Sequence, residues 1–219
     1  MIGEGFTRLW CFILDCVFPQ SCLGCEQVDV FLCNDCKVKI TSPGYFEEPG
    51  KHLTALYSLT EYKSDSVSGK LIESLKYNFS SEASGEIANW TLRSEEVLHK
   101  ITTDIVIPIP LHPRRYAERG FNQAEIIARP VAIYLKKPLA KTVLSRVKAT
   151  KQQALLGKNE REKNVADAFV VTKPNIVNGK ICLLVDDVYT TGSTMEAAAK
   201  TLLNSGAIKV VGFTLARTG

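Results

Sequence analysis

The sequence of 219 residues lacks any apolar run that approaches the roughly 18 residues required by a membrane-spanning helix. It also contains no internal repeat and no low-complexity tract. Hydrophobic residues make up 45% and charged residues 23% of the chain, a composition that excludes wholesale disorder. We therefore expect one packed domain of ordinary size with a small appendage, and no membrane span.

A secretory signal is also missing from the N-terminal segment. Its one apolar stretch, residues 9–14, is broken by Asp15, and no small-residue cleavage site follows. The segment instead predicts a short amphipathic helix within residues 1–18, which we expect to pack on the body of the protein. A peripheral contact of this helix with the inner membrane is the alternative, and in either case the chain is expected in the cytoplasm.

The chain has seven cysteines, and four of them form two C-x2-C pairs: Cys22, Cys25, Cys33 and Cys36. Two such pairs complete the tetrahedral sulfur shell that Zn²⁺ prefers and leave no position open for a substrate, so we expect a structural zinc knuckle. Disulfides are the alternative, but nothing marks the chain as secreted, and a reducing cytosol favours the metal. Cys182 is expected in the core. For Cys11 and Cys16, burial in a helix and a role as spare ligands both stay open.

Proline and glycine punctuate residues 41–51, which we predict to link a module at residues 1–45 to a domain at residues 52–219. Short apolar runs predict strands at residues 52–62, 104–110, 142–146, 167–172, 181–187 and 208–216. Apolar residues at helical spacing predict helices at residues 64–77, 85–100, 122–135 and 193–204, the third of them ending or bending at Pro130. Strands without strict alternation, separated by helices, indicate an α/β fold with a mostly parallel sheet flanked by helices on both faces.

The net charge of +4 is too small to indicate a nucleic-acid partner by itself, but the cations are unevenly distributed. Residues 146–164 carry six cations against two carboxylates, and a second cluster consists of Arg114, Arg115 and Arg119. A solvated surface explains either cluster taken alone. In a parallel sheet, however, ligands bind outside the carboxyl ends of the strands, where the predicted loops 111–120, 148–164 and 188–193 meet. Both clusters lie in these loops, which favours an anionic ligand.

Residues 183–195 read LLVDDVYTTGSTM. A strand that ends in a loop of small hydroxyl residues and then enters a helix offers N–H groups, hydroxyls and a helix N-terminus to a phosphate. Gly192 allows the main chain to approach that phosphate closely. The loop has no Gly-Lys pair, which excludes the Walker A type of triphosphate site.

Asp186 and Asp187 precede this phosphate loop. Carboxylates accept hydrogen bonds from vicinal hydroxyls and orient hydrated Mg²⁺. A ligand with a phosphate at one end and ribose hydroxyls in the middle would satisfy both parts of the motif. The alternative is a helix capped by one carboxylate, which leaves the hydroxyl series unexplained.

The segment from Leu184 to Thr194 resembles the phosphoribosyl pyrophosphate (PRPP) motif of type I phosphoribosyltransferases, and the resemblance implies that fold for the domain. It also implies that Asp186 and Asp187 bind ribose hydroxyls, that Mg²⁺ accompanies PRPP, and that the basic window is a mobile loop over the site. The 5-phosphate would lie on a set of small residues: Thr190, Thr191, Gly192, Ser193 and Thr194.

Other motifs narrow the resemblance. They are the cysteine knuckle, LKY at residues 75–77, PIPLHPRRYAERGFNQAE at residues 108–125, and a series of polar and cationic residues between Arg146 and Phe169. Together and in this order they are similar to the ComF family over nearly the whole chain. Members of that family are implicated in natural competence, in bringing single-stranded DNA into the cytoplasm, and the reaction of their phosphoribosyltransferase fold is not established.

Two functional hypotheses follow. A competence factor would aid import of single-stranded DNA, with PRPP and proteins of the competence machinery as partners, and Tyr116, Phe121 and Tyr189 would stack on bases. The alternative is a phosphoribosyltransferase of nucleotide salvage or related metabolism that acts on an unidentified acceptor. No residue is assigned to catalysis. In both hypotheses the pyrophosphate or the DNA phosphates would contact the same cations: Arg114, Arg115, Arg119, Lys151 and Arg161.

Overall fold

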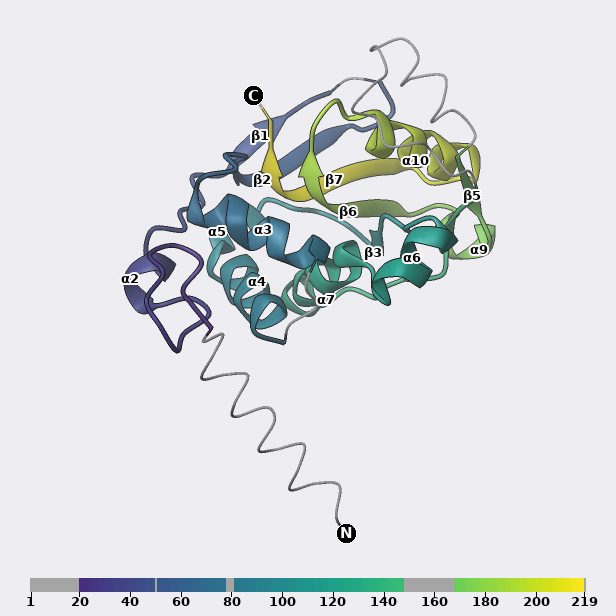
Figure 1. Cartoon of the computed structure of the whole chain (residues 1–219). Coiled ribbons are helices and arrows are strands. Elements are labelled where there is room, and N and C mark those ends of the chain that lie inside the picture. The colour runs from purple at the N-terminus through teal and green to yellow at the C-terminus, as the bar shows by residue number, and fades with distance from the viewer. Residues whose placement is uncertain (1–19, 50, 78–80, 148–167, 219) are drawn as a thin grey trace.

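The computed structural model describes residues 20–49, 51–77, 81–147 and 168–218 (Figure 1). A five-stranded sheet lies at its centre, in the order β1-β2-β7-β6-β3. Its strands are β1 (Tyr45–Glu47), β2 (Ala55–Glu61), β3 (Ile105–Pro108), β6 (Ile181–Tyr189) and β7 (Lys209–Arg217). Only β1 runs antiparallel to its neighbour, and the other pairs are parallel. The mostly parallel sheet predicted from the sequence is therefore confirmed.

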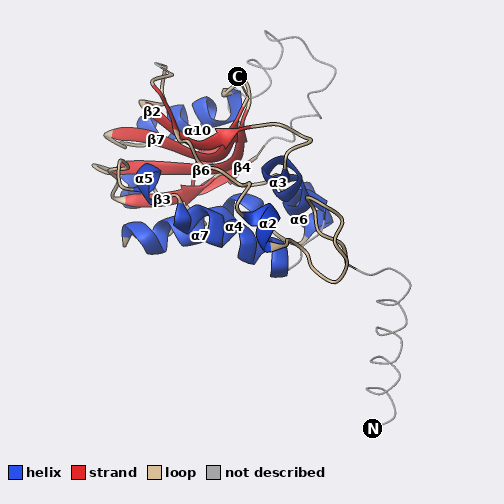
Figure 2. Cartoon of the chain, turned by 90° about the vertical axis from the view of Figure 1, so that its left-hand side faces the viewer, coloured by secondary structure: helices blue, strands red, loops and turns tan. Residues whose placement is uncertain are grey.

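Helices cover both faces of this sheet. One face carries α10 (Ser193–Asn204), and the opposite face carries α3 (Val67–Tyr77), α4 (Ser81–Arg93) and α7 (Gln123–Leu135) (Figure 2). The shorter helices are α2 (Asn34–Lys37), α5 (Glu95–Leu98), α6 (Pro113–Arg119) and α9 (Pro174–Val177). Because both faces are covered, strand β6 is buried without alternation from Cys182 to Val185, and Cys182 is a core residue as predicted.

Several predicted elements differ from the structure. Residues 111–120, expected as a loop, contain α6, which begins with Pro113 in its first turn and ends at Gly120 in the left-handed conformation. These are ordinary helix start and stop signals that the sequence interpretation passed over. The helix expected at residues 85–100 is two helices, because the chain breaks at Ser94, whose hydroxyl donates to the carbonyl of Trp90 at 3.0 Å.

The two short strands at the edge of the basic window also differ from expectation. β4 (Leu144–Arg146) and β5 (Phe169–Val171) pair with each other in a separate antiparallel sheet and do not join the central one. Residues 41–51, expected as a linker, contain β1. Helix α7 continues five residues past Pro130 to Leu135, and Pro130 is buried within it. The predicted helix at residues 1–18, with Cys11 and Cys16, lies outside the described residues.

The cysteine-rich module contacts the domain through apolar and polar groups, and its buried Leu32 and Ile40 belong to the same apolar cluster as residues of α3 and α4. The indole N–H of Trp90 donates to the hydroxyl of Ser42 at 2.7 Å, and the Ser94 hydroxyl lies 2.8 Å from the same oxygen. Lys37 in α2 pairs with Glu86 in α4 at 2.6 Å. Within the described part of the chain, no helix has both the length and the apolar character needed to cross a bilayer.

Candidate functional site

Strand β6 extends beyond its neighbour at the carboxyl edge of the sheet. β3 pairs with β6 only as far as Pro108 opposite Val185, and the N–H of Ile109 donates to the Val185 carbonyl at 2.9 Å. Asp186 to Tyr189 therefore continue past the last residue of β3. This geometry places Asp186 and Asp187 in the strand itself, at an edge that β3 does not cover, and the loop begins only at Thr190.

The loop from Thr190 to Gly192 leads directly into α10. Within the described residues, none of the main-chain N–H groups from Thr190 to Thr194 donates a hydrogen bond. The cap residue Gly192 supplies no side chain to the first turn of α10. The Thr191 and Ser193 hydroxyls are 2.6 Å apart and hydrogen-bonded to each other. Successive free N–H groups at the start of a twelve-residue helix form an environment for an anion.

Gly192 is required by the conformation of this loop. Its φ is +74°, and a Cβ atom at this position would collide with the ring and hydroxyl of Tyr189. The C-terminal segment contacts the start of the loop, because the Thr218 N–H donates to the Tyr189 carbonyl at 2.9 Å. Tyr189 thus packs against the loop, and its stacking on a base stays a prediction.

Asp186 and Asp187 form a close pair of carboxyl groups. Burial and the adjacent charge of Asp187 raise the pKa of Asp186 well above its usual value. Each carboxylate also accepts a hydrogen bond from the next main-chain N–H: Asp187 donates to Asp186 at 2.9 Å, and Val188 donates to Asp187 at 2.8 Å. A divalent cation, or hydroxyl donors from a sugar, would relieve the repulsion between the two charges.

Arg146 faces this carboxyl pair from β4. Its guanidinium lies 5.5 Å from the ring centroid of Phe169 in β5. Burial and the charge of Arg115 lower the pKa of Arg146, whereas the charge of Asp186 raises it. These charge effects indicate that Arg115 of α6 and Asp186 of β6 both lie near Arg146 of β4, although the three are far apart in the sequence.

Helix α6 supplies the other cations of this edge. It carries Arg114, Arg115 and Arg119, and the side chain of Tyr116 is 50% exposed on it. The helix is capped by His112, whose Nδ1 accepts a hydrogen bond from the Arg114 N–H at 3.3 Å. Lys151 and Arg161, the other two predicted phosphate contacts, lie outside the described residues, as does most of the basic window.

Asn122, within the sequence motif RGFNQAE, has a structural task next to α6. Its side-chain amide donates to the Ile109 carbonyl at 3.0 Å, and its oxygen accepts the Ala124 N–H at 3.1 Å. It therefore caps α7 and ties that helix to the segment that follows β3. The motif thus fixes the start of α7, which follows α6 in the chain.

The four-cysteine cluster lies beside the start of α3, where Gly24 comes close to Val67. The Sγ atoms of Cys22, Cys25, Cys33 and Cys36 all lie within 4.8 Å of one another. Cys25 and Cys33 are 3.6 Å apart, close to the ~3.7 Å separation of two sulfurs bound to one tetrahedral Zn²⁺ at about 2.3 Å. A Cβ atom at Gly24 would lie 2.5 Å from Cys36 Sγ, so this position admits only glycine. The donor set fits a zinc ion.

The thiols of this cluster differ in acidity. Burial disfavours ionisation of Cys22, but the N–H groups of Cys33, Gly24 and Cys25 outweigh it and lower its pKa to about 6. Burial and the neighbouring thiols raise the pKa of Cys36 to about 12. The Cys22 thiolate is therefore stabilised by the fold alone, whereas Cys36 needs a cation to ionise beside it.

Comparison with known proteins identifies the chain. The family model of the phosphoribosyl transferase domain matches residues 117–217. "Competence protein ComFC" of Bacillus subtilis is 37% identical over 115 residues, which are 52% of this chain and 45% of that protein. The chain belongs to the ComF family. "DNA utilization protein YhgH" of Shigella flexneri is 36% identical to this ComF-family chain over 154 residues, or 68% of it and 66% of YhgH.

This chain thus covers 66% of the length of YhgH and 45% of the length of ComFC, less than two thirds of either relative. Among solved structures, a glutamine PRPP amidotransferase from B. subtilis aligns with 66% of this chain and 30% of its own at 15% identity, with a TM-score of 0.44.

In this ComF-family chain, the sequence interpretation missed one residue of the carboxyl edge. Arg146 was quoted as part of the family resemblance but was not assigned to the site. Its place follows from the antiparallel pairing of β4 with β5, which sets Arg146 opposite Phe169. The two short strands are far apart in the sequence, and a sequence alone does not reveal which strands pair.

Proposed function

We propose that the carboxyl edge of the sheet binds PRPP with Mg²⁺, and that the protein serves in the handling of single-stranded DNA during natural transformation. One observation supports this proposal most directly. Among the described residues, the main-chain N–H groups from Thr190 to Thr194 donate no hydrogen bond, and they lie at the start of α10, directly after the carboxyl pair at the end of β6. The 5-phosphate would occupy the loop, and the ribose hydroxyls would contact Asp186 and Asp187.

The cations around this point suit the rest of the ligand. Arg115 and Arg146 lie near Asp186, where they would offset the charge of a pyrophosphate that Mg²⁺ also contacts. The lowered pKa of Arg146 reflects burial beside another cation, a cost that a bound polyanion would remove. These groups support binding, and the acceptor of a transfer reaction is not assigned to any of them.

The DNA part of the proposal rests on α6 and on the names of the relatives. Arg114, Arg119 and the exposed ring of Tyr116 offer phosphate contacts and one stacking surface on a single helix. The names competence protein and DNA utilization protein favour this role over nucleotide salvage. Structural Zn²⁺ in the cysteine cluster and the reduced thiols fit a cytoplasmic location.

Calorimetric titration with Mg²⁺ and PRPP tests the site. Changing Asp186→Asn together with Asp187→Asn should weaken binding at least tenfold, because two acceptors for the ribose and the cation are lost. Glu95→Gln together with Glu96→Gln, at two exposed carboxylates on α5, provides the same loss of two charges away from the site. Equal affinity in the two double variants would contradict the assignment.

The proposed binding of single-stranded DNA is tested with a fluorescent oligothymidylate. Binding should fall steeply with added salt and should weaken several-fold in Arg114→Ala with Arg119→Ala. Tyr116→Ala should weaken it without changing the salt dependence, because a ring carries no charge. A salt-insensitive signal, or no effect of the α6 variants, would contradict the proposal that α6 binds DNA.

A further inference from the structure

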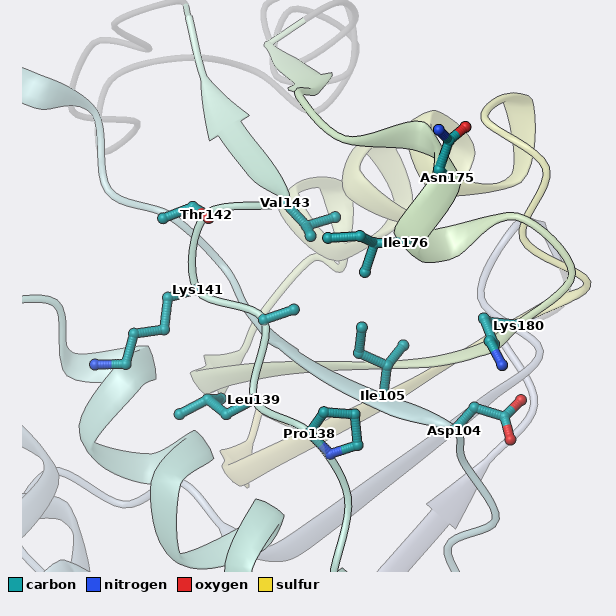
Figure 3. Close-up of a pocket in the computed structure, with 11 residues that line it drawn as sticks. Asp104, Ile105, Pro138, Leu139, Lys141, Thr142, Val143, Asn175, Ile176 and Lys180 are labelled. Carbon is teal, nitrogen blue, oxygen red and sulfur yellow. The ribbon is translucent and has the colours of Figure 1, made fainter.

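A second surface lies at the opposite, amino-terminal edge of the sheet. A hollow of about 690 Å³ opens where β3 and β6 begin, with Ile105, Pro138, Val143 and Ile176 among its apolar walls (Figure 3). A smaller hollow of about 400 Å³ adjoins it on α7, beside Ile133, and Leu139 lines both. These residues lie at the ends of β3 and β6 opposite to Asp186 and the phosphate loop.

The rim of the two hollows is cationic. Figure 3 shows Lys141 at one end of the larger hollow, with Lys180 and Asp104 at the other. Lys141 pairs with Glu125 at 3.0 Å, and the Asp104 carboxylate accepts the N–H of Ile181 at 2.9 Å. No carboxylate in the described part of the chain forms an ion pair with the remaining cations of the rim: Arg129, Lys136, Lys137 and Lys180.

Large apolar side chains are also exposed here. Ile133 is 68% and Ile176 39% exposed, and neither contributes to a core. Exposed isoleucines inside a cationic rim are typical of an interaction surface that binds an acidic partner with apolar side chains of its own. Carboxylates of the partner would meet the lysines, and its apolar side chains would enter the hollows.

The main chain between the hollows is an open sheet edge. The Val106 N–H donates to the Pro138 carbonyl at 3.0 Å, and the Ala140 N–H donates to the Val106 carbonyl at 2.8 Å. In such a parallel bridge the N–H and C=O of Leu139 point away from β3. Neither has a main-chain partner among the described residues. An extended chain can add a strand at such an edge.

From these observations we infer that residues 138–142 are the docking edge for an extended, acidic peptide segment of a partner protein. The peptide pairs with the main chain of Leu139, places alternate apolar side chains in the two hollows and sets its carboxylates against Lys136, Lys137 and Lys180. A nucleic-acid strand fits less well, because neither hollow is lined by an aromatic ring on which a base could stack. This inference does not depend on PRPP binding.

A display library of random twelve-residue peptides, selected on the full chain, tests the inference. Selection should enrich acidic sequences with apolar residues at alternate positions, and the best peptide, labelled with a fluorophore, should bind in an anisotropy titration. Lys137→Glu with Lys180→Glu should weaken that peptide at least tenfold. Lys70→Glu with Lys200→Glu, an equal change of charge at exposed positions of α3 and α10, should leave its affinity within twofold.

Three results would overturn the inference. One is a selection that yields no acidic, alternating peptide. Another is a peptide whose affinity is the same in the two charge-reversed variants. The third is binding of oligothymidylate, or of vesicles with anionic lipid, that is tighter than peptide binding and is lost in Lys137→Glu with Lys180→Glu. Retained Mg²⁺-PRPP binding in that variant shows that it is folded and that the proposed function is tested separately.

Discussion

Asp186 is the residue in which the demands of the fold and of the candidate ligand differ most. It is partly buried at the end of β6, and burial and Asp187 raise its pKa. An ionised carboxylate there destabilises the protein when no cation or hydroxyl donor is present. Such a cost is typical of residues that serve a ligand and not the folded state.

The pH dependence of stability should reveal this cost. Because the native pKa of Asp186 is raised, the wild-type protein loses stability as the pH rises through that pKa, and Asp186→Asn does not. The variant should therefore be more stable than wild type by about 1 kcal/mol at pH 8, a common gain when a functional group is removed. The gain should vanish below pH ~4, where the carboxyl group is protonated in both the folded and the unfolded state.

Urea unfolding of both proteins without ligand, between pH 3.5 and pH 8, measures the difference. Glu96→Gln serves as the control, because it removes one exposed carboxylate on α5, away from Asp186. A stability difference between Asp186→Asn and wild type that stays constant over the whole pH range would contradict the raised pKa.

At the scale of elements, the cysteine module is the part whose stability depends on a ligand of its own. Among residues 20–44, which the structure describes, its regular structure is limited to the single turn of α2 and one isolated bridge between Ser21 and Val28. Its apolar contribution is small, with Leu32 among its few fully buried aliphatic side chains. A module of this size depends on its metal for folding.

Removal of the metal should therefore unfold the module and leave the sheet intact. Purified protein should contain about one Zn²⁺ per chain by elemental analysis, and Cys33→Ser should lose it. Hydrogen exchange in residues 20–40 should become fast in that variant, whereas exchange in β6 and β7 should stay slow. Cys182→Ala, which removes a buried cysteine outside the cluster, should keep its zinc. A metal-free wild-type protein with slow exchange in the module would contradict this prediction.

The elements also show which parts of the fold a sequence can predict. Residues 193–204 were predicted as a helix with the bounds that α10 has, because its hydroxyl-rich start and apolar periodicity are local signals. The pairing of β4 with β5 was not predicted, because it joins strands separated by the whole basic window. The helix α6 was missed although its signals are local, since the cationic residues drew the interpretation towards a loop.

At the scale of the whole molecule, the parallel sheet separates two surfaces of different chemistry. The carboxyl edge has carboxylates, undonated N–H groups and arginines, as expected for a phosphorylated sugar. The amino edge has lysines, exposed isoleucines and an open main-chain edge. The order of strands places both surfaces on β3 and β6, so a peptide docked at Leu139 and a ligand at Asp186 would be joined by the same two strands.

From the sequence, only the part of the candidate site that lies in one continuous segment could be predicted. Asp186 to Thr194 are contiguous, so their spacing was enough to predict a carboxyl pair before a phosphate loop. Arg146 and the surface around Leu139 depend on tertiary contacts, and the sequence shows neither. The relation of α6 to this edge was expected from the general rule for parallel sheets, and the charge effects among Arg115, Arg146 and Asp186 agree with it.

Hydrogen exchange of the full chain with and without Mg²⁺ and PRPP tests the central claim most directly. The account predicts slower exchange of the amides from Thr190 to Thr194 when PRPP is present, in wild type and in Gly179→Ala. Gly179→Ala controls for a left-handed glycine, since its added Cβ meets nothing within 4 Å. Gly192→Ala, whose Cβ collides with Tyr189, should lose the protection. Protection that is absent in wild type, or that appears at residues 138–143 instead, would contradict the account.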